Sequence, residues 1–233
     1  MKYINPKIKK VLINEKGFGF IAIENISKNT ILIKEKPSFK IKEKEIFCDM
    51  FQLLYEIFTS NDSKKKKKFV SYRPVNLSDM FFDKKLIEIQ FGKLKNNNKG
   101  IKIYNFFKQN YSLDEIILFC GKYIQNAFSI KKWGPIILLN ASYFNHSCLP
   151  NVIFGRIDDY VEFITVKDIK KGEEICNNYI DILIEDSKRN QNLFNQYGFK
   201  CNCCRCIATN IKTKKILVDE VKNIVNQRIK RYR

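Results

Sequence analysis

Several features that would assign a chain to a common class are absent from this sequence. No run approaches the ~18 consecutive apolar residues that a membrane-spanning helix needs, and residues 1–6 lack the apolar core of a secretory signal. No internal repeat is visible, and histidine occurs once, as His146. We therefore expect a soluble, intracellular protein of the nucleus, the cytoplasm or both, without a membrane partner.

Acidic residues are few beside basic ones: 24 Asp and Glu against 43 Lys and Arg, which gives a net charge of +19. Such a charge attracts nucleic acid, acidic protein surfaces and anionic lipid, but it describes encounter and names no partner. Part of it is a solvated lysine run, Lys64–Lys68, inside a low-complexity stretch. With 45% apolar residues among 233, the chain is long enough to bury one sizeable core.

Half of the eight cysteines crowd into residues 201–206. Neighbours packed so closely cannot all reach good disulfide geometry, so a secreted disulfide framework is disfavoured. The spacing is typical of thiolate ligands of a metal ion. Tetrahedral zinc takes four ligands, the cluster offers at least three, and we choose Cys148 as the fourth.

The pattern of apolar residues predicts a mixed fold. Alternation predicts strands within residues 8–35, and a hairpin at 152–166 around an Asp-Asp turn. Helical spacing predicts a helix over 112–130, where Ser112 and Glu115 form a capping-box signature. Further helices are expected at 49–59, 185–196 and 213–231, the last of them basic and amphipathic, and exposed loops at 60–68 and 95–100.

Four polar motifs follow one another along the chain: Lys16–Ala22 with its two glycines, Asn126, Asn140–Asn151 and Gly172–Asp181. Glycines allow a close approach of the backbone to a ligand, although on their own they more often mark a plain turn. Asn145, His146 and Asn151 offer hydrogen bonds suited to a polar, zwitterionic ligand, although a lone histidine is usually structural. The motifs gain their meaning from their combination and order.

In that combination the chain resembles the SET methyltransferases, and among them the SMYD branch. Residues 145–151 read Asn-His-Ser-Cys-x-Pro-Asn, residues 172–181 read Gly-Glu-Glu with Tyr-Ile-Asp, and residues 197–206 read Tyr-x-Phe-x-Cys-x-Cys-x-x-Cys, as in that family. The resemblance implies an α+β, β-rich fold: a SET domain (β-clip) with a helical insertion between its two halves and a zinc-binding post-SET motif. The implied parts are an N-terminal SET half at 1–37, an insertion at 38–111, a C-terminal SET half at 112–187, a post-SET motif at 188–207 and a basic helix at 208–233.

The resemblance also implies a function and its residues. The chain would be a protein-lysine N-methyltransferase that takes its methyl group from S-adenosylmethionine and acts on a lysine of a histone or another protein. Cofactor contacts would come from Lys16, Gly17, Gly19, Asn126, Asn145, His146, Tyr179 and Phe199, with Phe199 stacking on the adenine. The catalytic residues would be Tyr179 and Tyr197, and a structural zinc ion would be held by Cys148, Cys201, Cys203 and Cys206.

The sequence also departs from the family. Residues 38–111 contain one cysteine, Cys48, and no histidine, so the MYND zinc finger of the SMYD branch cannot form there. Because the sequence ends soon after the cysteine cluster, we expect no long C-terminal helical domain. The alternative function is a catalytically inactive, zinc-stabilised SET module that binds chromatin or nucleic acid through its basic surface. A free-standing cysteine finger for nucleic acid is disfavoured, because only one cluster is present.

Overall fold

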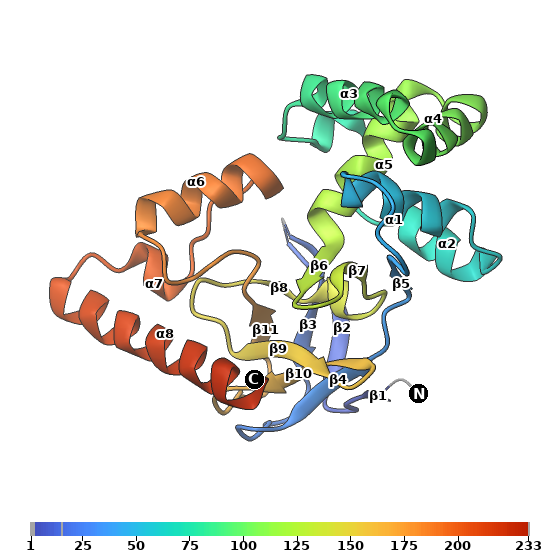
Figure 1. Cartoon of the computed structure of the whole chain (residues 1–233). Coiled ribbons are helices and arrows are strands. Elements are labelled where there is room, and N and C mark those ends of the chain that lie inside the picture. The colour runs from blue at the N-terminus through green and yellow to red at the C-terminus, as the bar shows by residue number, and fades with distance from the viewer. Residues whose placement is uncertain (1–2, 15, 233) are drawn as a thin grey trace. The chain divides into compact units, whose positions relative to one another are not determined.

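The structure, a computed structural model, describes residues 3–14 and 16–232 (Figure 1). The chain forms two compact units: the first comprises Met1–Lys36, Asn140–Phe194 and Phe199–Arg233, and the second Pro37–Leu139 and Asn195–Gly198. Residues 112–139 therefore pack with the residues before them, whereas the sequence resemblance grouped them with the C-terminal half. The five domain boundaries themselves stay predictions.

The first unit is built on two four-stranded sheets, with strand orders β1-β4-β10-β9 and β2-β3-β11-β8. Its strands are β1 (Tyr3–Ile4), β2 (Ile8–Ile13), β3 (Gly17–Ala22), β4 (Ile31–Glu35), β8 (Asn145–His146), β9 (Val152–Ile157), β10 (Tyr160–Thr165) and β11 (Glu174–Asn177). Its helices are the short η3 (Ala141–Tyr143), α6 (Asp186–Tyr197, whose last turn belongs to the second unit), α7 (Cys204–Ile207) and α8 (Ile211–Arg231).

The predicted hairpin is confirmed as β9 and β10, which pair antiparallel from Val152 opposite Thr165 to Ile157 opposite Tyr160. Asp158 in its turn has φ +51°, a left-handed conformation that Asp tolerates better than most residues. Phe154 and Phe163 face each other across the pair with stacked rings 5.2 Å apart. The alternating apolar residues thus form the core of this sheet.

The C-terminal helix α8 is confirmed and is tied to the first unit. Val221 and Ile224 are buried in one apolar cluster with residues of β9, β10 and the loops beside them. At the end of the helix, Arg231 Nε donates to the carboxylate of the buried Glu162 at 2.9 Å. The ring of Tyr232 covers Gly155 so closely that a Cβ there would lie 2.2 Å from it. One face of this basic helix is therefore structural.

The second unit is mainly helical and carries one three-stranded sheet, of strand order β5-β7-β6. Its strands are β5 (Phe39–Lys40), β6 (Ala127–Ile130) and β7 (Gly134–Ile137), and its helices are α1 (Asp49–Phe58), α2 (Ser63–Val70), η1 (Leu77–Asp79), α3 (Lys84–Lys93), η2 (Leu94–Asn96), α4 (Asn98–Asn110) and α5 (Leu113–Asn126). Aromatic rings fill its core: Phe58 lies 4.3 Å from Phe119 and 5.9 Å from Phe107 between ring centroids.

The prediction of a loop at 60–68 is wrong, because α2 occupies most of that stretch. The side chain of Asp62 caps the helix by accepting the Lys65 amide at 3.0 Å. Lysine is a good helix former, and the fully buried Phe69 anchors the last turn. Because Phe69 is the one buried residue of α2, the sequence shows no repeating apolar spacing there that would predict a helix.

The prediction of a loop at 95–100 is wrong in part, since α4 begins within it. Asn97 caps this helix by accepting the amides of Lys99 and Gly100. Gly100 lies against the backbone of η2, where a Cβ would come 2.4 Å from the Leu94 carbonyl oxygen. A cluster of Asn and Lys residues that suggested a loop therefore contains the start of a helix.

The predicted helix over 112–130 ends early. Its capping box is confirmed: Ser112 Oγ accepts the Glu115 amide, and the Glu115 carboxylate accepts the Ser112 amide at 2.8 Å. The helix stops at Asn126, whose side chain donates back to the Lys122 carbonyl at 2.9 Å. The following residues form β6 and pair with β7, so tertiary pairing overrides the helical spacing. No helix in the described ranges is long and apolar enough to cross a bilayer.

Candidate functional site

The Asn-His motif and the Gly-Glu-Glu motif meet in the first unit because β8 and β11 run parallel. Asn145 lies opposite Cys176, and His146 lies opposite Asn177. Asn151 fastens the pair, since its Nδ2 donates to the Glu174 carbonyl and its Oδ1 accepts the Cys176 amide, both at 2.9 Å. The side chain of Asn151 was expected to offer hydrogen bonds to a ligand, but here it makes them to the backbone of β11.

Tyr179 follows β11 and is held at both ends. Its hydroxyl donates to the Phe144 carbonyl oxygen at 2.8 Å, and its amide donates to His146 Nδ1 at 3.0 Å. Phe199 stands nearby, with its ring centroid 6.5 Å from that of Tyr179 and 6.0 Å from that of His146. The structure thus brings together three residues predicted for the cofactor and the chemistry.

Phe144 serves the site through its main chain and the core through its side chain. Its ring is fully buried and stacks on Phe163 at 4.9 Å. It contributes its carbonyl oxygen to the site and its ring to the core. Tyr143 is only partly buried, and it faces Phe18 edge-on at 6.3 Å.

Lys16, Gly19 and Asn145, all predicted cofactor contacts, gather around one carboxylate. Glu174 accepts from Lys16 Nζ at 2.6 Å and from Asn145 Nδ2 at 2.9 Å. Burial lowers the pKa of Lys16, but the hydrogen bond and the charge attraction to Glu174 together outweigh that effect and raise the pKa above its usual value. A Cβ on Gly19 would lie 2.5 Å from Asn145 Nδ2, so only glycine allows this approach, and the neighbouring Gly17 has φ +81°.

Glu174 and Glu35 are site residues that the sequence reasoning missed. Glu35 is buried, and its carboxylate accepts the amides of Asn140 and Ala141, each at 3.2 Å, and Asn140 Nδ2 at 2.8 Å. It therefore fixes the start of the segment that leads to Phe144. A signal was present: Glu35 shares its strand face with Ile33 in an alternating apolar strand, where a charge must have partners.

Asn177 is a further polar residue beside His146. Its side chain is fully buried, and neither its Nδ2 nor its Oδ1 has a hydrogen-bond partner within the described part of the chain. Buried amides are normally satisfied, so a bound polar group at this position would complete its hydrogen bonds. Nothing in the residue pattern distinguishes Asn177 from its neighbour Asn178.

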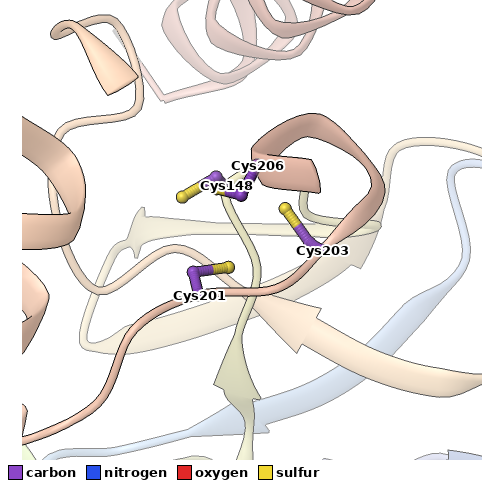
Figure 2. Close-up of side chains that lie close together, drawn as sticks. All are labelled: Cys148, Cys201, Cys203 and Cys206. Carbon is purple, nitrogen blue, oxygen red and sulfur yellow. The ribbon is translucent and has the colours of Figure 1, made fainter. Parts of the chain in front are cut away.

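Four cysteines form a candidate metal centre. The sulfur atoms of Cys148, Cys201, Cys203 and Cys206 all lie within 4.8 Å of one another, and these are the four ligands expected from the sequence. Figure 2 shows them gathered from two segments, with Cys148 on one, and Cys201 and Cys203 before α7 and Cys206 within it on the other. Tetrahedral zinc with bonds of about 2.3 Å needs sulfur atoms about 3.8 Å apart, which this spacing fits. Cys204 is exposed and stands outside the cluster.

Hydrogen bonds couple the four thiols of the cluster to one another and to neighbouring side chains. Hydrogen bonds from Cys148 lower the pKa of Cys203 to about 5 and hold the pKa of Cys201 below its usual range. The bond to Cys201 in turn raises the pKa of Cys148. His146 Nε2 lies 3.3 Å from Cys148 Sγ, and the buried Arg189 donates towards Cys206 Sγ at 4.0 Å. Thiolates that accept such bonds are the form that binds zinc.

Two predicted residues belong to the second unit. Asn126 Nδ2 donates to the Arg73 carbonyl at 2.9 Å as well as to Lys122. Tyr197 is in the last turn of α6, and burial raises the pKa of its phenol to about 12, so it is neutral at physiological pH. Their contacts with the cofactor and with the acceptor lysine stay predictions.

The fold and these motifs agree with comparison to known proteins, in which the SET domain family model matches residues 17–180. The chain belongs to the SET domain family. It is 39% identical over 219 residues to protein L678 of Acanthamoeba polyphaga mimivirus, a SET domain-containing protein, covering 94% of this chain and 83% of that one. It is 28% identical over 146 residues to the human N-lysine methyltransferase SMYD2, covering 57% of this chain and 34% of SMYD2.

Solved structures share the SET fold. The structure of Rubisco LSMT bound to AdoMet superposes with a TM-score of 0.59 at 17% identity, covering 84% of this chain and 52% of LSMT. At that identity the likeness concerns the fold alone. The chain spans about half the length of LSMT and 50% of the SET domain-containing protein DDB_G0283443 of Dictyostelium discoideum. The predicted SET fold, with helices between its halves and a C-terminal cysteine cluster that could bind a metal, is confirmed.

Proposed function

We propose that the chain is a protein-lysine N-methyltransferase that uses S-adenosylmethionine as its methyl donor. The observation that carries this proposal is Tyr179, fixed at both ends and placed beside Phe199 in a SET fold. Named relatives support it, since SMYD2 is an N-lysine methyltransferase and LSMT was solved with AdoMet. The acceptor would be a lysine of a histone or of another protein, in the nucleus, the cytoplasm or both.

The residues around Glu174 suit the amino-acid end of the donor. The carboxylate of S-adenosylmethionine would pair with Lys16, and the ammonium of S-adenosylmethionine would pair with Glu174 or the Asn145 side chain. The adenine would stack near Phe199, and the Asn177 amide could bind a polar group of the donor. Both ring nitrogens of His146 already have partners, so His146 would contact the donor through its main chain.

The reaction is an in-line displacement in which the neutral acceptor amine forms a bond to the methyl carbon. The carbon–sulfur bond breaks with its electron pair staying on sulfur, and the methylated amine then loses a proton to solvent. A lysine of ordinary pKa, about 10.4, must reach the site uncharged, and an apolar channel promotes this by desolvation. Because the Tyr179 hydroxyl donates a hydrogen bond to the Phe144 carbonyl oxygen, its lone pairs have a fixed direction in which to align the amine and the methyl group.

Substitution of Tyr179 by Phe tests this role. We expect Tyr179→Phe to lower kcat by at least about tenfold, because one aligning hydrogen bond is worth about 1.4 kcal/mol in the transition state. Affinity for S-adenosylmethionine, measured by calorimetry, should stay within about twofold. Equal kcat for mutant and wild type would remove Tyr179 from the mechanism. Cofactor binding without transfer in wild type would favour the inactive chromatin- or nucleic-acid-binding module, which the net charge of +19 suits.

A further inference from the structure

The His146 ring lies between the cysteine cluster and Tyr179 and touches both. Nδ1 accepts the Tyr179 main-chain amide at 3.0 Å, and Nε2 lies 3.3 Å from Cys148 Sγ. His146 is only 7% exposed, so water cannot easily replace either contact. This is the only histidine in the sequence, and its predicted role was cofactor binding.

The two contacts together assign a hydrogen-bonding role to each ring nitrogen. An imidazole nitrogen that accepts an N–H must carry a lone pair, so Nδ1 is unprotonated. In the neutral ring the hydrogen then sits on Nε2 and is directed to the Cys148 sulfur. An N–H···S bond of this kind stabilises a thiolate and orients it for a metal ion.

The segment 144–148, which contains His146, also binds the hydroxyl of Tyr179. The main-chain carbonyl oxygen of Phe144 accepts a hydrogen bond from that hydroxyl, and Cys148 belongs to the cysteine cluster. The position of residues 144–148 therefore fixes both the amide and the hydroxyl of Tyr179. Arg205 adds to this by donating to the Cys148 carbonyl at 3.2 Å and to the Ile182 carbonyl at 2.6 Å, which joins residues 148 and 182 on either side of Tyr179.

We propose that His146 is a positioning residue that couples the metal-bound cysteine cluster to the alignment of Tyr179. The proposal rests on the proposed methyltransferase function for its kinetic consequence, but its structural part stands without it. Metal loss would displace Cys148, and the His146 ring would transmit that displacement to the Tyr179 amide. The cluster would thus control turnover although it lies outside the reacting atoms.

Two substitutions separate the two halves of the ring. In His146→Asn the side-chain oxygen is placed to replace Nδ1 as acceptor for the Tyr179 amide, while the donor to Cys148 is lost. In His146→Gln the amide nitrogen is placed to replace Nε2 as donor to Cys148, while the acceptor for Tyr179 is lost. Cys204→Ser is the matched control, because Cys204 is an exposed thiol of the same segment outside the cluster.

Cobalt replaces zinc as the probe of the cluster. We expect His146→Asn to shift the thiolate-to-cobalt charge-transfer bands and to release the metal to a chelator at least threefold faster, whereas His146→Gln and Cys204→Ser stay close to wild type. For Tyr179, we expect amide hydrogen exchange to accelerate at least tenfold in His146→Gln and to remain slow in His146→Asn. Both readouts are made on the metal-loaded full chain without a methyl acceptor, so they hold even if no transfer is found.

The kinetic arm completes the test. His146→Gln should lower kcat at least about tenfold with little change in KM for S-adenosylmethionine, since a lost hydrogen bond of about 1.4 kcal/mol is one decade in rate. Unchanged cobalt bands in His146→Asn together with unchanged Tyr179 exchange in His146→Gln would overturn the proposal. Equal loss of cofactor affinity in both variants, with normal bands and exchange, would also overturn it and return His146 to direct cofactor binding. Thermal unfolding of each variant verifies that it is folded.

Discussion

The interior of each of the two units is stabilised by a different kind of interaction. Of the twelve buried polar or charged residues in the described ranges, ten lie in the first unit, and only Gln52 and Lys122 lie in the second. Of the twelve buried Phe and Tyr residues there, eight lie in the second unit and four in the first. The first unit is thus specified by hydrogen bonds that position individual backbone segments, and the second by the volume of its aromatic core.

The buried hydrogen bonds of the first unit suit its proposed function. Buried polar networks are costly when one partner is missing, so they define a single arrangement of the backbone. The first unit contains Tyr179, Phe199 and the cysteine cluster, whose proposed work needs atoms placed to within a fraction of an ångström. An aromatic core also stabilises a fold, but it tolerates the exchange of one apolar residue for another better than a hydrogen-bond network tolerates the loss of a partner. The reason is that the hydrophobic effect has no directional requirement.

The largest effect is expected from removing an aromatic ring in the second unit. Phe58 contacts the rings of Phe119, Phe107 and Tyr111, and Phe58→Ala should lower the free energy of unfolding by about 3–5 kcal/mol. Phe58→Leu should recover at least half of that loss, because it restores most of the volume. Denaturant unfolding followed by circular dichroism measures both. If the leucine variant were no more stable than the alanine variant, core volume would not be what holds this unit.

An intermediate effect is expected from a nearly isosteric change in the first unit. In Glu35→Gln the amide nitrogen would meet donors from Asn140 and Ala141, so the unfolding free energy should fall by about 1–3 kcal/mol although the volume hardly changes. The exposed Glu173→Gln serves as control and should change stability by less than about 0.5 kcal/mol. Equal stability of the two variants would contradict the contrast between chemistry and volume.

The smallest effect concerns the capping box of α5 in the second unit. Bonds from the Ser112 amide and hydroxyl lower the pKa of Glu115 from its ordinary 4.5. A depressed carboxyl pKa adds stability that is complete above pH 4.5 and is lost as the pH falls through the folded-state value. The stability difference between wild type and Glu115→Gln, from denaturant unfolding at a series of pH values, should therefore shrink below that point. A difference independent of pH would show that the charge of Glu115 does not matter there.

Motifs with fixed chemistry were the part of the structure that could be predicted from the sequence. The four cysteines come from segments more than fifty residues apart, yet they meet as expected, because a metal site restricts residue type and spacing together. The hairpin at β9 and β10 and the capping box at Ser112 were also readable, since both depend on a few neighbouring residues.

What could not be predicted depends on partners far along the chain. The helix α2 relies on one buried ring, Phe69, and β6 forms because β7 is there to pair with it. Glu35 gains its role from amides more than a hundred residues away, and Glu174 from Lys16 and Asn145. The Asn-His motif could be recognised in the sequence, but only the packed structure shows that the histidine ring faces Cys148 and Tyr179.

The most direct test of the proposed activity is transfer of a radiolabelled methyl group from S-adenosylmethionine to core histones, nucleosomes and a whole-cell lysate. The account predicts label on lysine residues with the wild-type chain and at least about tenfold less with Tyr179→Phe. Measurable donor binding with no label on any acceptor would contradict it, and would make the chain a zinc-stabilised binding module of the SET family.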